Sequence, residues 1–330
     1  MKALSALPFP RRDEEGFNMR AIPVIRKELA DHLGSRRFAI LFFVIVIAGV
    51  LATYQAGQSI RQDVTKDPEQ TFVFLRLFTS GNPVSFVSFV AFLGPLLGIA
   101  FGFDAINSEQ QRGTLGRLLS QPVYRDDVIN GKFLAGLGII SVTMLCIFFI
   151  VAGLGLRMIG VPPTADELIR ILFFLVISII YVGFWLALAM LFSLLTKQAA
   201  TSALASLAVW LFMAIFVTIF AGFIAGVVYP TTDNSPAQQV LDHVGLQQNI
   251  ARISPAALYG EATSAILDPE ERTTSGLVLL SDAQAMVPGA LSLDQSLLLV
   301  WPDITATIAL TTICFGVAYY TFLRQEVRTL

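Results

Sequence analysis

The stretch ILFFLVISIIYVGFWLALAMLFSLL, residues 171–195, decides the fold class of this chain, because its 25 residues contain no Asp, Glu, Lys or Arg. At about 1.5 Å per residue, a helix of this length crosses the roughly 30 Å hydrocarbon core of a bilayer. Five other apolar runs are long enough, or nearly so, to do the same. The six expected spans are residues 38–54, 84–103, 133–156, 171–195, 199–228 and 304–323.

The composition of the whole chain agrees with a membrane protein. Of its 330 residues, 55% are hydrophobic and 14% are charged, and the mean hydropathy is +0.70. Soluble domains have about 25% charged residues, so a soluble enzyme is excluded. The net charge of −2 gives no basic excess for nucleic acid. Both cysteines lie in apolar runs, which indicates no disulfide framework and no zinc site.

The basic residues predict the orientation. Fifteen of the 22 Lys and Arg residues lie before the first span, in the loop 104–132, just after residue 195, or at the C-terminus. Cytoplasmic segments retain positive charge, so we expect a multi-pass protein of the cytoplasmic membrane with both termini in the cytoplasm. The outer loop 229–302 has short apolar pieces at 277–280 and 297–301, which suggest re-entrant or interfacial helices. A structured cap is favoured over a substrate gate.

The N-terminal segment divides into two parts. Residues 1–18 are expected to form a disordered tail, and Met19 is a possible alternative start. Residues 19–37 predict an amphipathic "elbow" helix with Pro23 near its start, lying in the inner membrane interface. It serves either as a membrane anchor or also as a contact for a cytoplasmic partner. Its apolar residues are Ile22, Ile25, Leu29 and Leu33, and its polar face includes Arg26, Lys27 and Glu28.

Glycines recur every four residues in two of the spans. Gly94, Gly98 and Gly102 lie in the second span, and Gly222 and Gly226 lie in the fifth. Small residues at this spacing allow helices to pack closely in membranes. We expect packing within the bundle, with a homodimer seam as an alternative for the fifth span. That span is also so long that it must tilt, kink at one of its glycines, or project from the bilayer.

Signs of catalysis are missing from the sequence. Gly131-Lys132 is not a P-loop, because position 126 is Asp and position 133 is Phe. The chain has two histidines, distant in topology, and neither is expected to be a ligand. The six apolar runs contain no charged residue between their ends, which disfavours an ion-driven pump. We therefore expect that the energy for any transport enters from outside the bilayer.

The loop 104–132 is the most informative segment. It contains Glu109, Arg112-Gly113-Thr114-Leu115, Leu118-Leu119-Ser120, Pro122, Arg125 and Gly131-Lys132. Leu115, Leu118 and Leu119 form a short apolar stripe bounded by the two breakers Gly113 and Pro122. A solvated loop with one helical turn is the plain interpretation. A short helix that presents this stripe to a docking partner is the functional one.

These loop residues resemble the cytoplasmic loop of ABC-2 type permeases, the membrane subunits of ATP-binding-cassette transporters. The segments 25–29 and 35–37, followed by a span, are similar to the branch of copper-processing permeases of the nitrous-oxide reductase system, and 253–262 is similar as well. The resemblance runs from about residue 20 to the end of the chain.

The resemblance implies an all-α, six-span permease bundle over residues 38–330, preceded by the elbow helix. It implies a homodimer, or a pair with a similar subunit, and two copies of a cytoplasmic ATPase that binds ATP and Mg. This chain would hold no cofactor, and export is the expected direction of transport. The implied ATPase-coupling residues are Glu109, Arg112, Gly113, Thr114, Leu115, Leu118, Leu119 and Arg125.

The substrate is not indicated by the sequence. Copper transport is not predicted, because the spans contain no Met or Cys cluster and no His pair of the kind that soft metals bind. Two other functions stay open. One is a membrane scaffold or maturation factor for an extracytoplasmic enzyme, with the outer loop as its working part. The other is an ATP-independent channel or carrier, which the lack of intramembrane charge weakens.

Overall fold

The computed structural model describes residues 16–66, 72–80, 85–111, 113, 125–232, 235–269 and 291–324. Within these ranges the regular structure is helical and no strand occurs. Six helical segments are long and apolar enough to cross a membrane, which confirms the predicted all-α class and the six spans. They are Arg36–Arg61, Phe86–Gln111, Arg125–Ile159, Ala165–Leu195, Ala199–Val228 and Leu293–Arg324.

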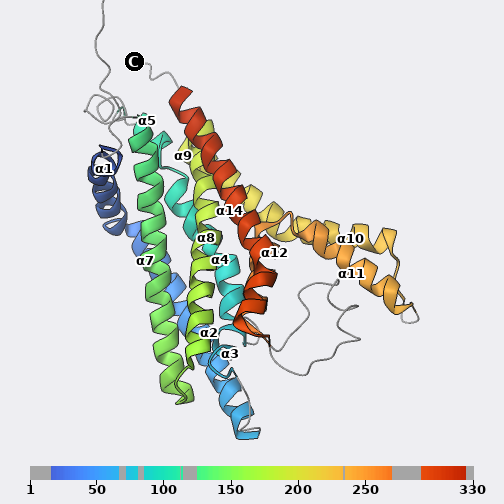
Figure 1. The fold of residues 1–330 in the computed structure, drawn as a ribbon. Helices are drawn as coiled ribbons and strands as arrows, with labels where there is room; N and C mark the ends of the chain where they lie inside the picture. Colours follow the sequence, from blue (N-terminus) through green and yellow to red (C-terminus); the bar gives the residue numbers. More distant parts are fainter. Residues whose placement is uncertain are drawn as a thin grey trace, which may run out of the picture.

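The helices are labelled in Figure 1. Four spans are α2 (Arg36–Lys66), α7 (Arg125–Ile159), α8 (Ala165–Leu195) and α14 (Leu293–Arg324), and the second contains α4 (Phe86–Gly102) and α5 (Asn107–Gln111). The fifth is formed by α9 (Ala199–Leu211), the π-helix η1 (Phe212–Phe216) and α10 (Val217–Val228). The other helices are α1 (Gly16–Leu33), α3 (Arg76–Thr79), α11 (Ala237–Ala251) and α12 (Pro255–Leu267).

Helix α8 is the centre of the bundle. Most of its apolar window, 61%, is buried, compared with 17% for the fifth and sixth spans, and α4, α7, α12 and α14 pack around it (Figure 1). Its first turn begins with a capping box, in which the Thr164 hydroxyl accepts from the Glu167 N–H and the Glu167 carboxylate accepts from the Thr164 N–H. Residues 181–190, in the middle of this helix, are all buried, as expected for an apolar stretch with neighbours on every side, whereas Leu168 and Leu172 near its start are exposed.

The glycines of α4 allow it to approach α8 closely. A Cβ atom on Gly98 would lie 2.5 Å from the Val182 carbonyl oxygen, and one on Gly102 would lie 2.7 Å from the Ala189 Cβ. At Gly94 the nearest atom would be 2.9 Å away. These distances are too short for any side chain. The glycines of α10 are not packed as closely as those of α4. A Cβ on Gly226, for example, would meet nothing within 4 Å.

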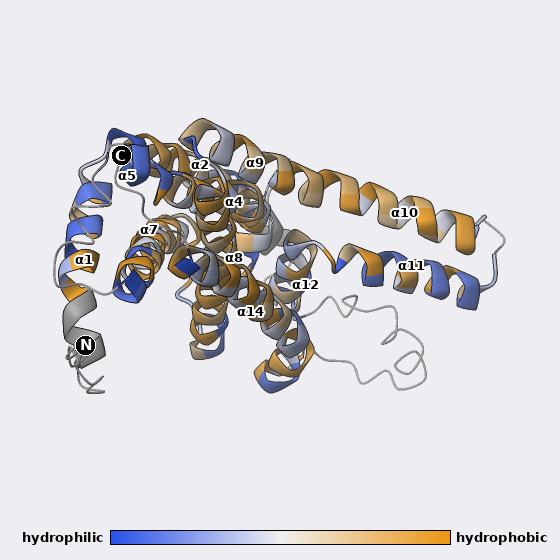
Figure 2. Cartoon of the chain, turned by 90° about the horizontal axis from the view of Figure 1, so that it is seen from above, coloured by the Kyte–Doolittle hydropathy of each residue, from blue (hydrophilic) through white to orange (hydrophobic). Residues whose placement is uncertain are grey.

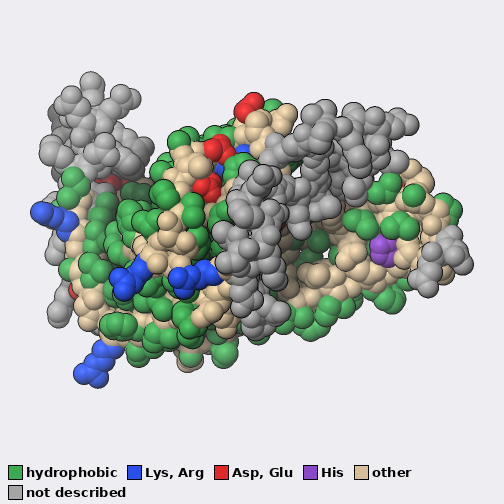
Figure 3. Space-filling model, turned by 90° about the horizontal axis from the view of Figure 1, so that it is seen from below, with side chains coloured by type: hydrophobic (Ala, Val, Ile, Leu, Met, Phe, Trp, Pro, Cys, Tyr) green, Lys and Arg blue, Asp and Glu red, His purple; other side chains and the backbone are tan. Residues whose placement is uncertain are grey.

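The two ends of the bundle are distinct. Helices α1 and α5 and the last turns of α14 lie at one end, and α3 lies at the other (Figure 1). The hairpin of α10 and α11 projects from the side of the bundle (Figures 1 and 2). Seen from the α3 end, hydrophobic side chains are mixed with polar ones, and several Lys, Arg, Asp and Glu side chains are visible among them (Figure 3). Large apolar side chains such as Phe149 and Leu204 are exposed on the spans, and such positions suit lipid rather than water.

Several predicted boundaries differ from the structure. The sixth span begins at Leu293 rather than 304, so 297–301 belongs to α14 and is not a separate interfacial helix. The sequence obscured this continuity because Pro302 and Asp303 interrupt the apolar run. The helices found in the outer loop are instead α11 and α12, and 277–280 lies outside the described residues.

The N-terminal helix and the fifth span also differ in detail. Helix α1 begins at Gly16, inside the segment expected to be a tail, and therefore contains Pro23 in its interior. The distortion of the fifth span is the π-helix η1, upstream of Gly222 and Gly226, where a kink was one of the three expected ways to accommodate the length of this span. A π-helix widens the helix locally and often occurs at functional sites.

Three charged residues lie just before predicted apolar runs, yet the structure places them inside the spanning helices. Lys132, Arg170 and Asp303 are all buried, so the expectation of spans without charge holds only for the shorter predicted runs. Arg170 has a structural explanation. Its guanidinium donates to the carbonyls of Ile266 and Leu291 at 3.0 and 2.7 Å, and thereby ties α8 to α12 and to the segment that precedes α14.

Candidate functional site

An ion cluster joins three segments at the α5 end of the bundle. The Lys132 ammonium on α7 lies 2.9 Å from the Glu28 carboxylate on α1 and 3.0 Å from the Glu109 carboxylate on α5. Lys27 lies at the edge, 3.6 Å from Glu28 and 3.7 Å from Glu109. We call these four residues the Lys132 cluster. They connect the elbow helix, the start of the loop and the third span.

The local sequence explains how Lys132 reaches this position. Asp126 and Asp127 lie in the first turn of α7, where acidic residues stabilise the positive end of a helix. Lys132 follows within two turns, on the side of α7 against which α1 packs. Glu28 is the residue through which the polar part of α1 meets α7, and it is 8% exposed.

Burial gives the cluster its mechanical importance. The side chain of Lys132 is 4% exposed, and those of Glu28 and Glu109 are 11% and 14% exposed. Removing one partner from a buried ion pair leaves an uncompensated charge and costs about 3–5 kcal/mol. The charges of two glutamates and two lysines compensate one another here. Separating α1, α5 and α7 would leave these buried charges unpaired, so the cluster stabilises the packing of the three helices.

The protonation states of Glu28 and His32 on α1 depend on their burial and on the charges next to them. Burial alone would raise the pKa of Glu28, but the neighbouring Lys132 ammonium outweighs burial and lowers that pKa below its usual value. For His32, one turn later on α1, burial disfavours the charged ring and lowers the pKa. The His32 ring packs edge-on against Phe101 of α4 at 5.2 Å between centroids. Near neutral pH, α1 thus docks with an ionised Glu28 and a neutral His32.

The predicted elbow residues play separate parts. Glu28 is buried in the cluster, Lys27 is 51% exposed at its edge, and Arg26 is on the exposed side of α1. At the beginning of α2, Arg37 pairs with Asp104, the first residue of the loop, and its guanidinium lies over the Phe103 ring. The elbow is thus fixed to the bundle at two places.

The predicted loop residues are only partly visible. Glu109 is in the cluster, Gly113 has the left-handed φ of +66° that glycine adopts without strain, and Arg125 is the first residue of α7. Arg112, Thr114, Leu115, Leu118 and Leu119 lie outside the described residues. Sequence reasoning did not assign Lys132 to the site. The available signal was a lysine immediately before an apolar run, where a basic residue can also be simply interfacial.

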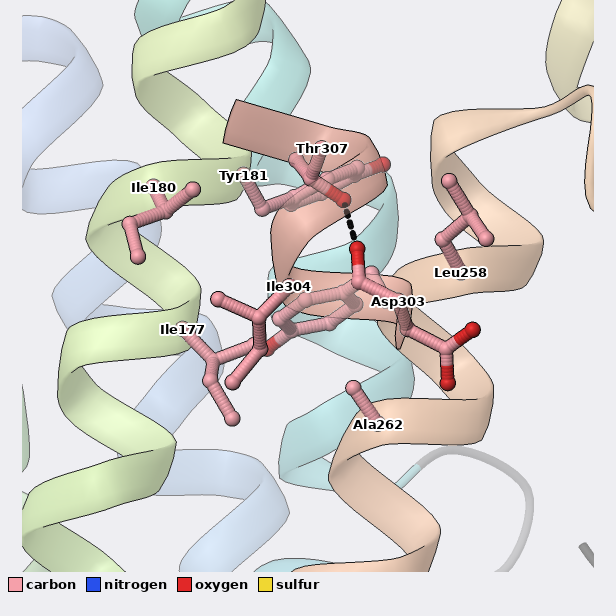
Figure 4. Close-up of a pocket in the computed structure, with 9 residues that line it drawn as sticks. Ile177, Ile180, Tyr181, Leu258, Ala262, Asp303, Ile304 and Thr307 are labelled. Carbon is pink, nitrogen blue, oxygen red and sulfur yellow. Dashed lines mark hydrogen bonds between the residues drawn. The ribbon is translucent and has the colours of Figure 1, made fainter. Parts of the chain in front are cut away.

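A cavity between α8, α12 and α14 is a second candidate site. It has about 10 Å³ of space, roughly enough for one water molecule, and is lined mainly by apolar and aromatic side chains, with Asp303 and Thr307 on one side (Figure 4). Tyr181 donates to the Ala91 carbonyl at 2.8 Å, which Pro95 leaves without a helical donor. Tyr259 shares a hydrogen bond with Ser178 at 3.0 Å. Ligand pockets usually measure about 300–1,000 Å³, so this space is small for a transported substrate.

Among the described residues, no three His, Cys, Asp or Glu side chains gather closely enough to hold a metal ion. The Lys132 cluster joins α1, α5 and α7 through buried ion pairs, and we take it as the main candidate site.

Comparison with known proteins agrees with this architecture. Residues 22–327 match the family described as ABC-2 family transporter protein. The chain is 31% identical over 208 residues to the "Probable ABC transporter permease protein NosY" of Pseudomonas aeruginosa. It is 30% identical over 198 residues to the protein of the same description in Stutzerimonas stutzeri. Each match covers 60% of this chain and 66% of the relative.

The family match extends over nearly the whole chain, including the elbow helix and all six spans. It confirms the resemblance seen in the sequence and the prediction of a permease rather than an enzyme. The chain belongs to the ABC-2 transporter family, as a multi-pass membrane permease subunit.

Proposed function

We propose that this chain forms the membrane path of an exporter driven by ATP, which a separate cytoplasmic subunit hydrolyses. Two permease chains would pair with two ATPase chains, which bind ATP and Mg. Closure of the ATPase dimer would push on the loop 104–132, and the movement would reach the spans through helices that the loop contacts. The substrate stays open in this proposal.

The observation that carries the proposal is the Lys132 cluster. A loop that receives force from a partner must be joined rigidly to the helices that it moves. Glu109 at the start of the loop and Lys132 at its far end meet in one buried contact, together with Glu28 of the elbow. The two ends of the loop are thereby joined to each other at the surface of the bundle. A displacement of the loop would therefore be transmitted to α1 and α7 together.

The charge distribution supports the proposed orientation. Arg26, Lys27, Arg36 and Arg37 are all exposed at the end of the bundle that carries α1 and α5. Positive charge is retained on the cytoplasmic side. This end, the loop and both termini would therefore face the cytoplasm.

The fifth span supports pairing of two permease chains. Its α10 part has large exposed apolar side chains, among them Phe223 at 69% and Val227 at 67%. The surface around Gly226 is open, so a second helix can approach the backbone there. In this arrangement the projecting hairpin of α10 and α11 would contact a second copy of the chain.

Co-purification tests the proposal. The tagged chain is purified gently from its own host, and the co-purifying chains are identified by mass. We expect one with a Walker A sequence, near one-to-one, that hydrolyses ATP. Recovery of the permease without such a chain, even when candidate ATPase subunits are added, would favour a channel or a scaffold.

A variant of the loop makes the test specific. Leu118→Asp should abolish recovery of the ATPase while leaving membrane insertion intact, because the charge would enter the apolar docking stripe. Leu118→Met keeps the stripe apolar and serves as the matched control. Equal recovery of the ATPase with both variants would contradict docking at this loop.

A further inference from the structure

Helix α5 is fastened to a second cytoplasmic connection, the turn between α8 and α9. Ser193, near the end of α8, is fully buried. Its hydroxyl oxygen accepts from the backbone N–H groups of Ile106 and Asn107 at 3.0 and 3.2 Å. The first N–H groups of a helix have no partner within the helix. Here the residue before α5 is the apolar Ile106, which cannot cap the helix with its own side chain, so Ser193 supplies the acceptor from another helix.

The other end of α5 has a similar contact. The Gln111 side-chain amide donates to the Lys197 carbonyl at 2.7 Å. Lys197 lies in the turn that joins α8 to α9, two residues before Ala199. Both ends of α5 are thus held by the segment that leads into the fifth span, and the contacts are separate from the Lys132 cluster.

The fifth span is the part of the bundle that can respond to such a contact. Only 17% of its apolar window is buried. Trp210 is its last strongly buried side chain before η1, and it packs against Phe92 of α4 with 5.1 Å between ring centroids. No residue of η1 is buried. Beyond η1 the main neighbour of α10 is α11 rather than the central bundle.

We propose that Ser193 and Gln111 are positioning residues that pass nucleotide-dependent movement of the cytoplasmic loop to the fifth span. A displacement of α5 shifts the α8–α9 turn through these two side chains, and α9 carries the displacement to η1, where the helix is free to bend. This inference rests on the proposed function and adds a second route beside the Lys132 cluster, which acts on α1 and α7.

The test measures movement of α10 in the assembled complex of permease and ATPase. Spin labels are placed on the native Cys146 of α7, which is exposed, and on Thr218→Cys of α10, an exposed polar position outside the apolar surface proposed for pairing, in a Cys314→Ala background. The distance distribution is recorded without nucleotide and with ATP and vanadate. We expect a nucleotide-dependent shift in this background, and we expect that shift to be largely lost when Ser193→Ala and Gln111→Ala are combined.

Two controls separate positioning from simple loss of structure. Ser193→Thr keeps the hydroxyl and should retain the shift. Ser206→Ala removes another fully buried hydroxyl, one that donates only to the Ser202 carbonyl within α9, and it should also retain the shift. ATP hydrolysis by the complex should continue in the Ser193 and Gln111 variants, because they alter transmission rather than the ATPase.

The outcomes distinguish the two proposals. A shift of normal size in the combined Ser193 and Gln111 variant, or equal loss in Ser206→Ala, overturns the positioning role while the transporter assignment stands. If the labelled complex without these substitutions shows no shift, or if no ATPase assembles, the proposed function fails and this inference fails with it.

Discussion

Replacing Lys132 with Met would leave Glu28 and Glu109 as two buried carboxylates without their shared cation. Loss of one partner from a buried ion pair costs about 3–5 kcal/mol. Lys27 lies 3.6 and 3.7 Å from the two carboxylates and is half exposed, so it compensates in part. We therefore expect a destabilisation at the lower end of that range, about 3 kcal/mol. Its main effect should be that α1 detaches from α7 more often.

Hydrogen exchange measures this detachment directly. Each 1.4 kcal/mol is a factor of ten, so the exchange rate of the α1 amides should rise roughly 100-fold in Lys132→Met, while the α8 amides change little. Lys27→Met is the matched control. It removes a half-exposed lysine, whose ion pairs contribute less than about 1 kcal/mol, and should raise α1 exchange by less than about tenfold.

A triple variant isolates charge from packing. Lys132→Met combined with Glu28→Gln and Glu109→Gln has no uncompensated charge and should recover most of the lost protection. Unchanged α1 exchange in Lys132→Met, or a triple variant as exposed as the single one, would refute the reasoning that the cluster holds the elbow by paired charge.

Two further predictions concern packing and pH. Gly98→Ala should lower the unfolding temperature, since overpacking typically costs about 1–3 kcal/mol, whereas Gly226→Ala should leave it nearly unchanged in the isolated chain; equal effects in a thermal melt would contradict the close approach of α4 and α8. Because burial lowers the pKa of His32 below 6.5, the docked elbow binds fewer protons than the free one. Docking should be complete above pH 6.5 and weaken as the pH falls toward the lowered pKa. The pKa of Glu28 is also lowered, from its usual value of 4.5. The ionised Glu28 carboxylate therefore stabilises docking fully above pH 4.5, and this stabilisation is lost only in stronger acid. Once the intrinsic pH dependence of amide exchange is divided out, His32→Gln should remove the pH dependence of the α1 protection factors between pH 5 and 7. A wild-type dependence of these protection factors in that variant would assign it to another group.

The fold class could be predicted because a membrane span depends on composition alone. The run 171–195 needs no knowledge of its neighbours to be identified as a helix, and it became the central helix α8. The beginning of the sixth span was missed for the opposite reason. Asp303 ended the apolar run in the sequence, yet it is buried against other helices, and burial of a single polar group is a property of tertiary packing.

The sequence singled out the elbow and the loop as candidate segments but did not predict the contacts between them. The loop was identified from Glu109 and its neighbours, and the elbow from its helical pattern. That Glu28 and Glu109 share Lys132 depends on how α1 lies across α7, with 104 residues separating Glu28 from Lys132. Likewise, nothing local in the sequence links Ser193 to α5, because a serine in an apolar run normally bonds within its own helix.

In the proposed transporter, the elbow, the loop and the third span move as one unit when the partner ATPase binds nucleotide. Hydrogen exchange of the assembled complex, measured with and without a non-hydrolysable ATP analogue, tests this movement. We expect protection to change together in α1, α5 and the first turns of α7, and we expect Lys132→Met to remove this coupling. A change confined to one of these helices, or no change in any of them while the ATPase binds the analogue, would contradict movement as one unit.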